Sequence, residues 1–393
     1  MTLKKLFLSH QHDDAPAVRE LATDLRLRGI APWVDKDGGF SIGDESIAEA
    51  RRVIREDCFG LLLYATEAAF MSRFIRDVEL DEAVAVKRRD PAYILFAVPC
   101  DMGFRAVQER SVTEFAVDLS AFHGVPIHTG AVSADRATVA SAVLEKVLRR
   151  DQLVAPDIGT LSLQFSTREM LPDMPGDVLR IDAVPLLAAA PGDADAWGRM
   201  LVALRDVKAR IAANYGRPRL RVHGSKHLTA AFLFGRVFAP FELEIRQTPT
   251  AVWHTDVLAK ATAPLTVRCV TGAADTGTLF VEIVSRDKDI ATGVDALIAG
   301  GLPSPSVRLQ LRPPGAPLTV DNDLCRAMVA QIYAEIGQAM QRRRISAIHL
   351  FAAAPQALMM MLGREFRGMP PVHLYEWDGG QYLSSCSVPA GVL

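Results

Sequence analysis

The sequence predicts an α/β protein in which a doubly wound, flavodoxin-like parallel sheet is followed by two further Rossmann-like halves. Two observations carry this prediction. Short apolar runs alternate with amphipathic helical segments over residues 1–150; this pattern is typical of right-handed βαβ units and of a parallel sheet with helices on both faces. A strand–turn–helix segment then occurs twice in the rest of the chain, at an offset of 128 residues.

The first 150 residues contain four predicted strands that alternate with helices. The strands are expected over residues 3–9, 30–34, 60–65 and 93–98, and the helices over residues 15–28, 47–55, 73–89 and 136–150. In the first helix the apolar residues recur at helical spacing, and Gly29 ends it. Ligands of such sheets bind beyond the carboxyl ends of the strands, so we expect a site in the segments after Leu8, Val34 and Tyr64.

The repeat defines the second part of the chain. After a predicted linker over residues 151–160, residues 220–236 align without a gap to residues 348–364. Each copy reads as a strand, a turn of small residues, an apolar helix and a Gly–Arg pair. A long helix precedes each copy and a strand follows it, so we expect residues 161–393 to form two pseudo-symmetric halves, about 161–250 and 251–393.

Composition limits the classes of protein that fit. The chain has 393 residues, 49% of them hydrophobic, and a formal net charge of −2, which indicates two or three compact units. The apolar runs are too short to span a membrane or to act as a signal peptide. The five cysteines are scattered and form no C-x-x-C pair, as in reduced cytoplasmic proteins. We therefore expect a cytoplasmic protein without a membrane partner.

The charge is unevenly distributed. Residues 199–246 hold ten basic and three acidic side chains. Proteins that bind duplex DNA are usually more basic than this, so the stretch favours a small, confined anionic ligand over DNA.

Two histidines invite a metal-site interpretation. His10, His12 and Asp13 stand close together after the first predicted strand, and such residues can bind zinc. The last histidine of an H-x-H-x-D-H pattern is missing, however, and the motif follows the first strand of the chain, so that no sheet comes before it. We expect no metal there.

The helix that begins near Ser72 carries Glu79 and Glu82. Most acidic residues on a helix are simply solvated. A carboxylate near the start of a helix that follows a central parallel strand, however, faces the place where a sugar could be held.

At these residues the sequence resembles TIR domains. Phe7-Leu8-Ser9 with the acidic pair at 13–14 is similar to their first box, and Trp33-Val34-Asp35 with the glycine-containing loop to Gly43 is similar to their second strand and BB loop. The segment 72–83 is similar to the one that carries the catalytic glutamate. Phe74 replaces the usual tryptophan, and Glu79 falls one residue later than in many relatives, so Glu82 remains an alternative.

The resemblance implies cleavage of the nicotinamide–ribose bond of NAD⁺, with NAD⁺ as substrate, no cofactor, and Glu79 as the catalytic residue. Nicotinamide leaves as a neutral group from a cationic one, so a single carboxylate that stabilises the oxocarbenium-like transition state suffices. The residues expected to line the NAD⁺ pocket are Ser9, His10, Trp33, Asp35, Ser72 and Phe74. A TIR domain can also be a non-catalytic signalling scaffold, which is the alternative function.

The second part resembles the SAVED domain, a fusion of two CARF-like units that senses cyclic oligonucleotides in bacterial anti-phage (CBASS) signalling. The paired repeats and the ending Tyr375-Glu376-Trp377 carry this resemblance. It implies a cyclic oligoadenylate as activating ligand, cyclic tri-adenylate being favoured, and a homo-oligomer or filament on activation. Small residues before a helix expose N–H groups to phosphate, and tryptophans can stack on adenines. The residues expected to bind the ligand are Gly224, Ser225, Lys226, His227, Arg199, Arg246, Trp253, Ala353, Pro355 and Trp377, with Trp197 and Arg221 as further candidates.

Overall fold

The computed structural model has two compact units, each described here by itself. The first comprises Met1–Ile158, Pro172–Asp182 and Ala209–Gly216, and the second comprises Gly159–Leu171, Ala183–Lys208 and Arg217–Leu393. The prediction placed one linker at 151–160, whereas the first unit also takes in two later segments. The structure describes residues 4–34, 44–119, 124–154, 159–188, 192–246, 251–256, 265–273, 275–285, 290–314 and 320–391.

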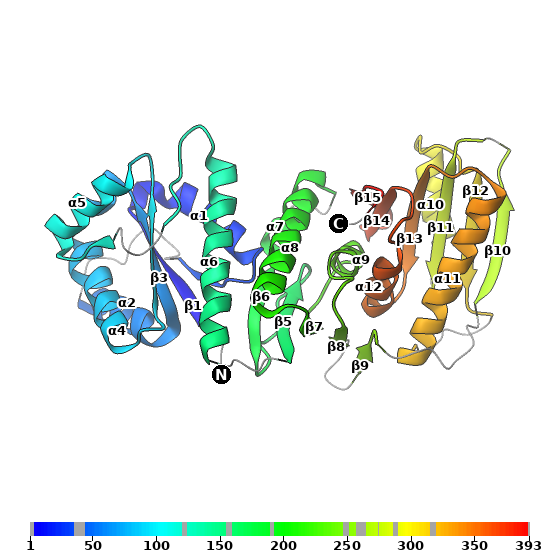
Figure 1. Cartoon of the computed structure of the whole chain (residues 1–393). Coiled ribbons are helices and arrows are strands. Elements are labelled where there is room, and N and C mark those ends of the chain that lie inside the picture. Colours follow the sequence, from blue (N-terminus) through cyan, green and yellow to red (C-terminus); the bar gives the residue numbers. More distant parts are fainter. Residues whose placement is uncertain are drawn as a thin grey trace. The chain divides into compact units, whose positions relative to one another are not determined.

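The first unit contains a parallel sheet in the order β2-β1-β3-β4. Its strands are β1 (Lys5–Ser9), β2 (Pro32–Trp33), β3 (Cys58–Ala65) and β4 (Ile94–Pro99). Its helices are α1 (Ala15–Arg26), α2 (Asp44–Arg52), α3 (Glu67–Met71), α4 (Asp81–Arg89), α5 (Phe104–Phe115) and α6 (Val132–Val154). Figure 1 shows α1 and α6 on one side of the sheet and α2 and α4 on the other. The predicted parallel sheet covered on both faces is confirmed.

Two helical segments differ from their predicted form. The helix expected over 73–89 is a π-helical turn, η3 (Ile75–Leu80), followed by α4. The helix expected over 47–55 begins at Asp44 and continues into a second π-helical turn, η2 (Val53–Asp57). A third short segment, the 3₁₀ turn η1 (His12–Asp14), precedes α1. Helix α5 was not predicted.

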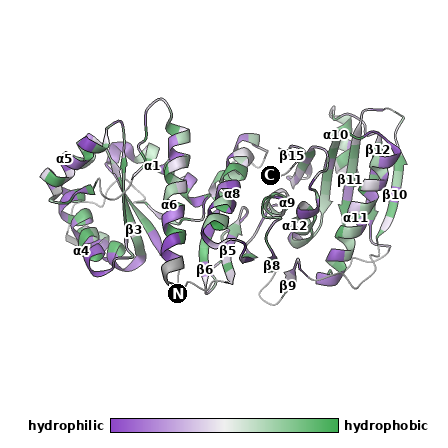
Figure 2. Cartoon of the chain, viewed as in Figure 1, coloured by the Kyte–Doolittle hydropathy of each residue, from purple (hydrophilic) through white to green (hydrophobic). Residues whose placement is uncertain are grey.

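The core of this unit lies where the buried strands meet the helices. Every residue of β3 is buried, as expected for a central strand of a sheet covered on both faces. In Figure 2 the strand β3 is coloured largely as hydrophobic, whereas the helices α4 and α6 alternate between hydrophobic and hydrophilic residues. The strand β6 (Asp177–Asp182) also belongs to this unit, and the Arg180 amide donates to the Gly29 carbonyl oxygen at 2.9 Å.

The second unit contains strands of two sheets. In one sheet its strands follow the order β5-β7-β8-β9, and the other sheet has the order β10-β12-β11-β13-β14-β15. The central strands β12, β11, β13 and β14 are parallel, and the edge strands β10 and β15 are antiparallel to their neighbours.

The elements of these sheets have the following bounds. The strands are β5 (Thr160–Ser166), β7 (Arg219–His223), β8 (Leu243–Arg246), β9 (Val252–His254), β10 (Thr266–Thr271), β11 (Thr278–Val284), β12 (Val307–Arg312), β13 (Ala347–Ala353), β14 (Val372–Asp378) and β15 (Gln381–Val388). The helices are α7 (Val184–Ala188), α8 (Ala194–Tyr215), α9 (Leu228–Val237), α10 (Ala291–Ala299), α11 (Asn322–Arg342) and α12 (Gln356–Glu365). None of the described helices is long and apolar enough to cross a membrane.

The repeated helices α9 and α12 pack against each other through their glycines. A Cβ atom at Gly235 would clash with the carbonyl oxygen of Met360, and one at Gly363 would clash with that of Phe232. Met360 and Gly363 lie 128 residues after Phe232 and Gly235, so the two contacts are the same contact seen from either helix. This reciprocity is the signature of a two-fold relation, here within one chain.

Candidate functional sites

A buried carboxylate lies at the carboxyl edge of the first unit's sheet. Glu79 belongs to the π-helical turn η3, and only 7% of its surface is exposed. The Oγ of Ser9, the last residue of β1, donates a hydrogen bond to Glu79 Oε2 at 2.5 Å. Ser9 pairs with Leu63 of the adjacent central strand β3, so this carboxylate sits where ligands of parallel sheets bind. π-Helical turns are frequent at such sites.

The neighbouring Glu82 has a different environment. Its Oε1 lies 3.6 Å from Nη1 of Arg55 and 3.5 Å from Nη2 of Arg89. Two guanidinium groups therefore flank Glu82, whereas a buried hydroxyl holds Glu79. The first arrangement is typical of a structural ion-pair network near the surface.

Two of the residues expected in the NAD⁺ pocket contact the backbone or the core. The Nδ1 of His10 lies 3.0 Å from the carbonyl oxygen of Leu8. The ring of Trp33 stacks on Phe7, with centroids 4.6 Å apart and planes 13° apart, and it packs against the core. The structure thus gives Trp33 at least a partly structural role.

Two more of the residues expected in the NAD⁺ pocket, Ser72 and Phe74, precede the first residue of η3. The Oγ of Ser72 accepts a hydrogen bond from the amide of Ile75 at 3.3 Å, and Phe74 is half-buried. Asp35 lies outside the described residues. Among the described residues, no three His, Cys, Asp or Glu side chains are grouped so that they could hold a metal ion.

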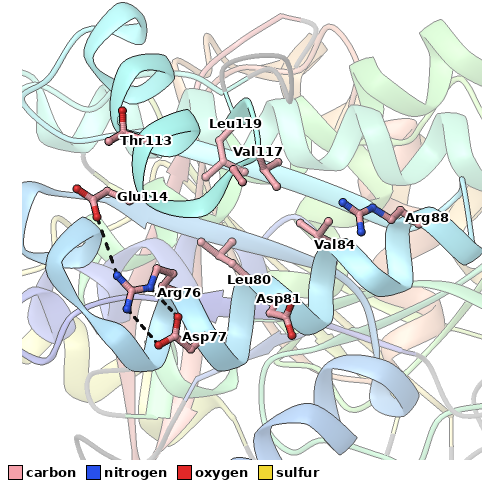
Figure 3. Close-up of a pocket in the computed structure, with 11 residues that line it drawn as sticks. Arg76, Asp77, Leu80, Asp81, Val84, Arg88, Thr113, Glu114, Val117 and Leu119 are labelled. Carbon is pink, nitrogen blue, oxygen red and sulfur yellow. Dashed lines mark hydrogen bonds and ion pairs between the residues drawn. The ribbon is translucent and has the colours of Figure 1, made fainter.

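The outer face of the same helical segment lines a separate pocket of about 560 Å³. Figure 3 shows Leu80 and Val84 pointing towards Val117 and Leu119, with charged side chains at the ends of the pocket. Glu79 is not among its lining residues.

In the second unit, a pocket of about 280 Å³ lies at the carboxyl ends of strands from both repeats. Its charged and amide side chains are Arg168, Lys226, Gln356 and Glu376. Its aromatic wall is formed by Tyr375, Trp377 and Tyr382, and the turn 352–355 forms a further wall with Leu228.

The turn after β7 is fixed by the segment after β5. The Oγ1 of Thr167 accepts from the amide of His227 at 2.8 Å, and the amide of Thr167 donates to the Ser225 carbonyl oxygen at 2.9 Å. Gly224 has a φ of +117°, and a Cβ atom there would clash with the Phe165 carbonyl oxygen. Only glycine fits this turn without strain.

Lys226 is buried against this turn, with 2% of its surface exposed. Its Nζ donates to the Gly224 carbonyl oxygen at 2.7 Å. Burial lowers the pKa of Lys226 to about 7, because the charged form loses its hydration. Burial, followed by the charge of Arg168, likewise lowers the pKa of His227 to about 4.

Glu376 lies on the opposite repeat and closes the start of α9. Its Oε1 accepts a hydrogen bond from the amide of Thr229 at 2.5 Å, and its Oε2 lies 3.6 Å from Nη2 of Arg168. Burial raises the pKa of this carboxyl group, although the Thr229 amide and Arg168 oppose the shift. The N-terminus of α9, expected to receive a phosphate, is therefore capped by the protein's own carboxylate.

The aromatic wall is held by its own contacts. Trp377 and Tyr382 meet edge to face with centroids 5.1 Å apart. The hydroxyl of Tyr375 lies 2.7 Å from Nδ1 of His349, which is buried on the neighbouring strand. Tyr375 and Tyr382 are buried, whereas Trp377 is half-buried, so Trp377 is the ring of this wall on which a planar base can stack.

Comparison with known proteins identifies both parts. Residues 6–122 match the family model of the TIR domain. Residues 203–388 match the model of the SMODS-associated and fused to various effectors sensor domain, SAVED. The chain joins a TIR domain to a SAVED domain.

Solved structures agree with this assignment at the level of the fold. The Acinetobacter baumannii Cap4 SAVED/CARF-domain containing receptor with the cyclic trinucleotide 2'3'3'-cAAA is 15% identical, with a TM-score of 0.51 over 95% of this chain and 98% of that one. The same receptor with 3'3'3'-cAAA has the same identity and TM-score, over 95% and 97% of the two chains. A search of the curated proteins found no relative.

The SAVED pocket contains some of the residues named from the sequence. Lys226, Ala353, Pro355 and Trp377 line it. Gly224, Ser225 and His227 form the turn that supports Lys226.

Other residues named from the sequence lie elsewhere in the SAVED domain. Arg246 and Arg221 both contact Glu244, at 3.3 and 2.6 Å, so the two arginines share one carboxylate within the sheet. Trp253 is 5% exposed and Trp197 is fully buried, which corrects the expectation that they stack on a base. Arg199 lies on α8, outside the pocket lining.

Several lining residues were missed, above all Arg168, Gln356 and Glu376. Arg168 follows β5, a strand that was not predicted because the linker was extended over its first residue. Recognition of that strand would have placed Arg168 at a carboxyl edge. Glu376 stood in the segment that carried the SAVED resemblance, but nothing in the sequence showed that it reaches α9.

Proposed function

We propose that this protein is an enzyme that cleaves NAD⁺ to nicotinamide and ADP-ribose, or its cyclic form, when a cyclic oligonucleotide binds its SAVED domain. The observation that supports the catalytic part is the buried Glu79 carboxylate, held by Ser9 at the carboxyl edge of the TIR sheet. The resemblance to the catalytic segment of TIR enzymes points to the same residue.

The environment of Glu79 suits this chemistry. Breaking the nicotinamide–ribose bond develops positive charge on the ribose, and a preorganised carboxylate lowers the energy of that transition state. The Ser9 hydroxyl holds the carboxylate in place at the carboxyl edge of the sheet, where the ribose would lie. Glu82 is engaged by Arg55 and Arg89, so we assign the catalytic role to Glu79.

The sensor part rests on the pocket shared by the two SAVED repeats. Arg168 and Lys226 provide positive charge, and Trp377, which is half-buried, provides a stacking surface beside the buried Tyr375 and Tyr382. A ligand that combines phosphates with bases fits this set. The solved Cap4 receptors carry cyclic trinucleotides, and we propose a cyclic tri-adenylate for this chain.

We further propose control by association, as in an abortive anti-phage response of the CBASS type. Ligand-bound chains would assemble into an oligomer or filament and bring TIR domains together, because a permanently active NAD⁺-cleaving enzyme would kill its host. Light scattering with and without cyclic tri-adenylate tests this step independently of catalysis.

The catalytic proposal is tested by incubating the full-length protein with NAD⁺, with and without cyclic tri-adenylate, and by measuring nicotinamide and ADP-ribose by chromatography. Glu79→Gln should reduce nicotinamide release by at least about 100-fold. The matched control Glu82→Gln should retain the rate within about twofold, since it alters the ion pairs of Glu82 with Arg55 and Arg89 and leaves the hydrogen bond between Ser9 and Glu79 in place.

Other outcomes decide between the alternatives. If cyclic tri-adenylate binds and no nicotinamide is released, the TIR domain is a non-catalytic scaffold controlled by the messenger. If Glu82→Gln abolishes turnover and Glu79→Gln does not, the catalytic assignment is wrong.

A further inference from the structure

The SAVED pocket already contains an anion, the carboxylate of Glu376, and we call this part of the pocket its floor. Glu376 reaches from β14 to the first turn of α9, where the Thr229 amide donates to its Oε1 at 2.5 Å. Only 3% of the Glu376 side chain is exposed. The start of a ten-residue helix would otherwise be a natural place for a phosphate. Here the chain's own carboxylate fills it.

This arrangement restricts where a ligand's phosphates can lie. A phosphate at the floor would face the Glu376 carboxylate in a poorly hydrated environment, where repulsion between like charges is strong. Arg168 extends from the rim, with 49% of its side chain exposed, and its Nη2 lies 3.6 Å from Glu376 Oε2. A phosphate that binds Arg168 therefore remains at the rim, on the solvent side of the carboxylate.

The floor then has to meet an uncharged part of the ligand. The Thr229 amide and Arg168 both favour the ionised form of Glu376 against the effect of burial. An ionised carboxylate only accepts hydrogen bonds, so the matching group must be a donor. Trp377, the half-buried ring of the aromatic wall, lines the same pocket, and a base that stacks on it presents an edge to the pocket in which the Glu376 carboxylate lies. The exocyclic amino group of adenine is such a donor: it is neutral, and it projects from the edge of the ring.

We propose that Glu376 is a specificity-determining residue of the SAVED pocket, whose carboxylate accepts a hydrogen bond from the exocyclic amino group of one ligand base while Arg168 holds a phosphate at the rim. This inference rests on the proposed sensing of a cyclic oligonucleotide. It adds the chemical group that is recognised, an exocyclic amino group, and the residue that recognises it, Glu376.

The hydrogen bond between Glu376 and the amino group should have a measurable effect on affinity. A hydrogen bond from a neutral donor to a buried carboxylate contributes about 10-fold to 100-fold in affinity. A ligand that lacks the amino group leaves the carboxylate without this donor in a site that excludes water. The loss should appear in the dissociation constant.

The experiment compares two ligands on full-length protein by isothermal titration calorimetry. One is cyclic tri-adenylate, and the other is the same ring with unsubstituted purine, in which hydrogen replaces each 6-amino group. The wild type should bind the purine ring about 10-fold to 100-fold more weakly. Glu376→Gln keeps an oxygen for the Thr229 amide but presents a neutral side chain, and it should reduce this ratio to about threefold or less.

Arg168→Met is the matched control. It removes the rim cation and should weaken both ligands by a similar factor, so the ratio between them stays at the wild-type value. Circular dichroism and thermal unfolding establish that each variant is folded. If Glu376→Gln does not fold, the wild-type comparison alone still tests the proposal.

The outcomes are distinct. Equal affinity of the wild type for both ligands overturns the role of Glu376 and leaves the sensor function standing. If Glu376→Gln leaves the ratio of the two dissociation constants unchanged, the role of Glu376 is likewise overturned, because another group then recognises the amino group. No binding of cyclic tri-adenylate to the wild type overturns the proposed sensor function itself.

Discussion

The two turns that meet at the SAVED pocket occupy equivalent positions in the two repeats but differ in chemistry. Residues 224–227 follow β7, and residues 352–355, 128 positions later, comprise the last two residues of β13 and the two that follow it. The first turn carries Lys226 and is tied to Thr167 of the segment after β5. The second is uncharged, and Gln356 beyond it donates to the Lys226 carbonyl oxygen at 2.9 Å.

This difference shows how a duplicated fold can bind an asymmetric set of groups. The backbone contact between α9 and α12 is preserved in both directions, while the turns have diverged into a charged wall and a neutral one. We therefore expect a ligand with repeated units to be held unequally by the two halves, and the following variants test that expectation.

The largest effect is expected at the first position of the two turns. Gly224→Ala forces a residue with a Cβ atom into a φ of +117° and against the Phe165 carbonyl oxygen. It should destabilise the SAVED domain by about 2–4 kcal/mol and abolish binding of cyclic tri-adenylate. The equivalent change in the other repeat, Ala352→Gly, should cost about 1 kcal/mol. Scanning calorimetry compares the two, and equal effects would contradict the asymmetry.

The second effect concerns charge. Lys226→Met removes the buried cation but keeps a similar volume, so we expect cyclic tri-adenylate to bind about 10-fold to 100-fold more weakly at pH 6.5. At the equivalent position, Ala354→Ser should change the dissociation constant by less than about threefold. Calorimetric titration measures both. Wild-type affinity in Lys226→Met would show that phosphates do not bind near this turn.

The third effect is a difference in stability between variants of Arg236 and Arg364, the two arginines of the Gly–Arg pairs. Nη1 of Arg364 donates to the carbonyl oxygens of Phe238 and Phe241 beyond the end of α9. Arg236 is 3% exposed; it donates to the Gly391 carbonyl oxygen, while its Nε and Nη1 have no partner among the described residues.

Arg364→Met should therefore cost about 2 kcal/mol, because two carbonyl groups lose their donor. Arg236→Met should change stability by less than about 1 kcal/mol, since it also removes a poorly compensated buried charge. Thermal unfolding of the full chain checks both, and a larger loss for Arg236→Met would reverse our assignment.

The smallest effect is a pH dependence. The pKa of Lys226 is about 7 without ligand, and a bound phosphate raises it, so binding takes up a proton. Affinity for cyclic tri-adenylate should therefore fall as the pH rises above 7, by up to about tenfold per unit. Titrations between pH 6 and 9 in two buffers measure the slope and the proton uptake. The Lys226→Met variant should flatten the curve, and a flat wild-type curve would place the anion elsewhere.

Much of the fold followed from local patterns. The alternation of apolar and amphipathic segments predicted the TIR sheet, and the repeat predicted the paired helices of the SAVED domain. The segments that were missed, such as β5, β10 and α5, lie outside the repeated copies or lack a clear period. The π-helical turn at Glu79 was also missed, because π-helical turns are rare and the sequence predicts one continuous helix there.

The site was harder to predict because it depends on long-range contacts. Glu79 and Lys226 were named from motifs, and the structure places both in buried positions at carboxyl edges of sheets. The cap that Glu376 places on α9 spans 147 residues of sequence, and no local rule joins those positions. Trp253 and Arg246 were named for their residue types, which say nothing of whether a ring is buried or a charge is paired.

The reciprocal glycine contact between α9 and α12 has a consequence for motion. Since neither helix has a side chain between it and the other's backbone at Gly235 and Gly363, the pair has almost no freedom to slide or separate. Its amides should be among the slowest in the SAVED domain to exchange with solvent deuterium. Any rearrangement on ligand binding must then occur in the turns and strands around this pair, with the two helices moving as one rigid body.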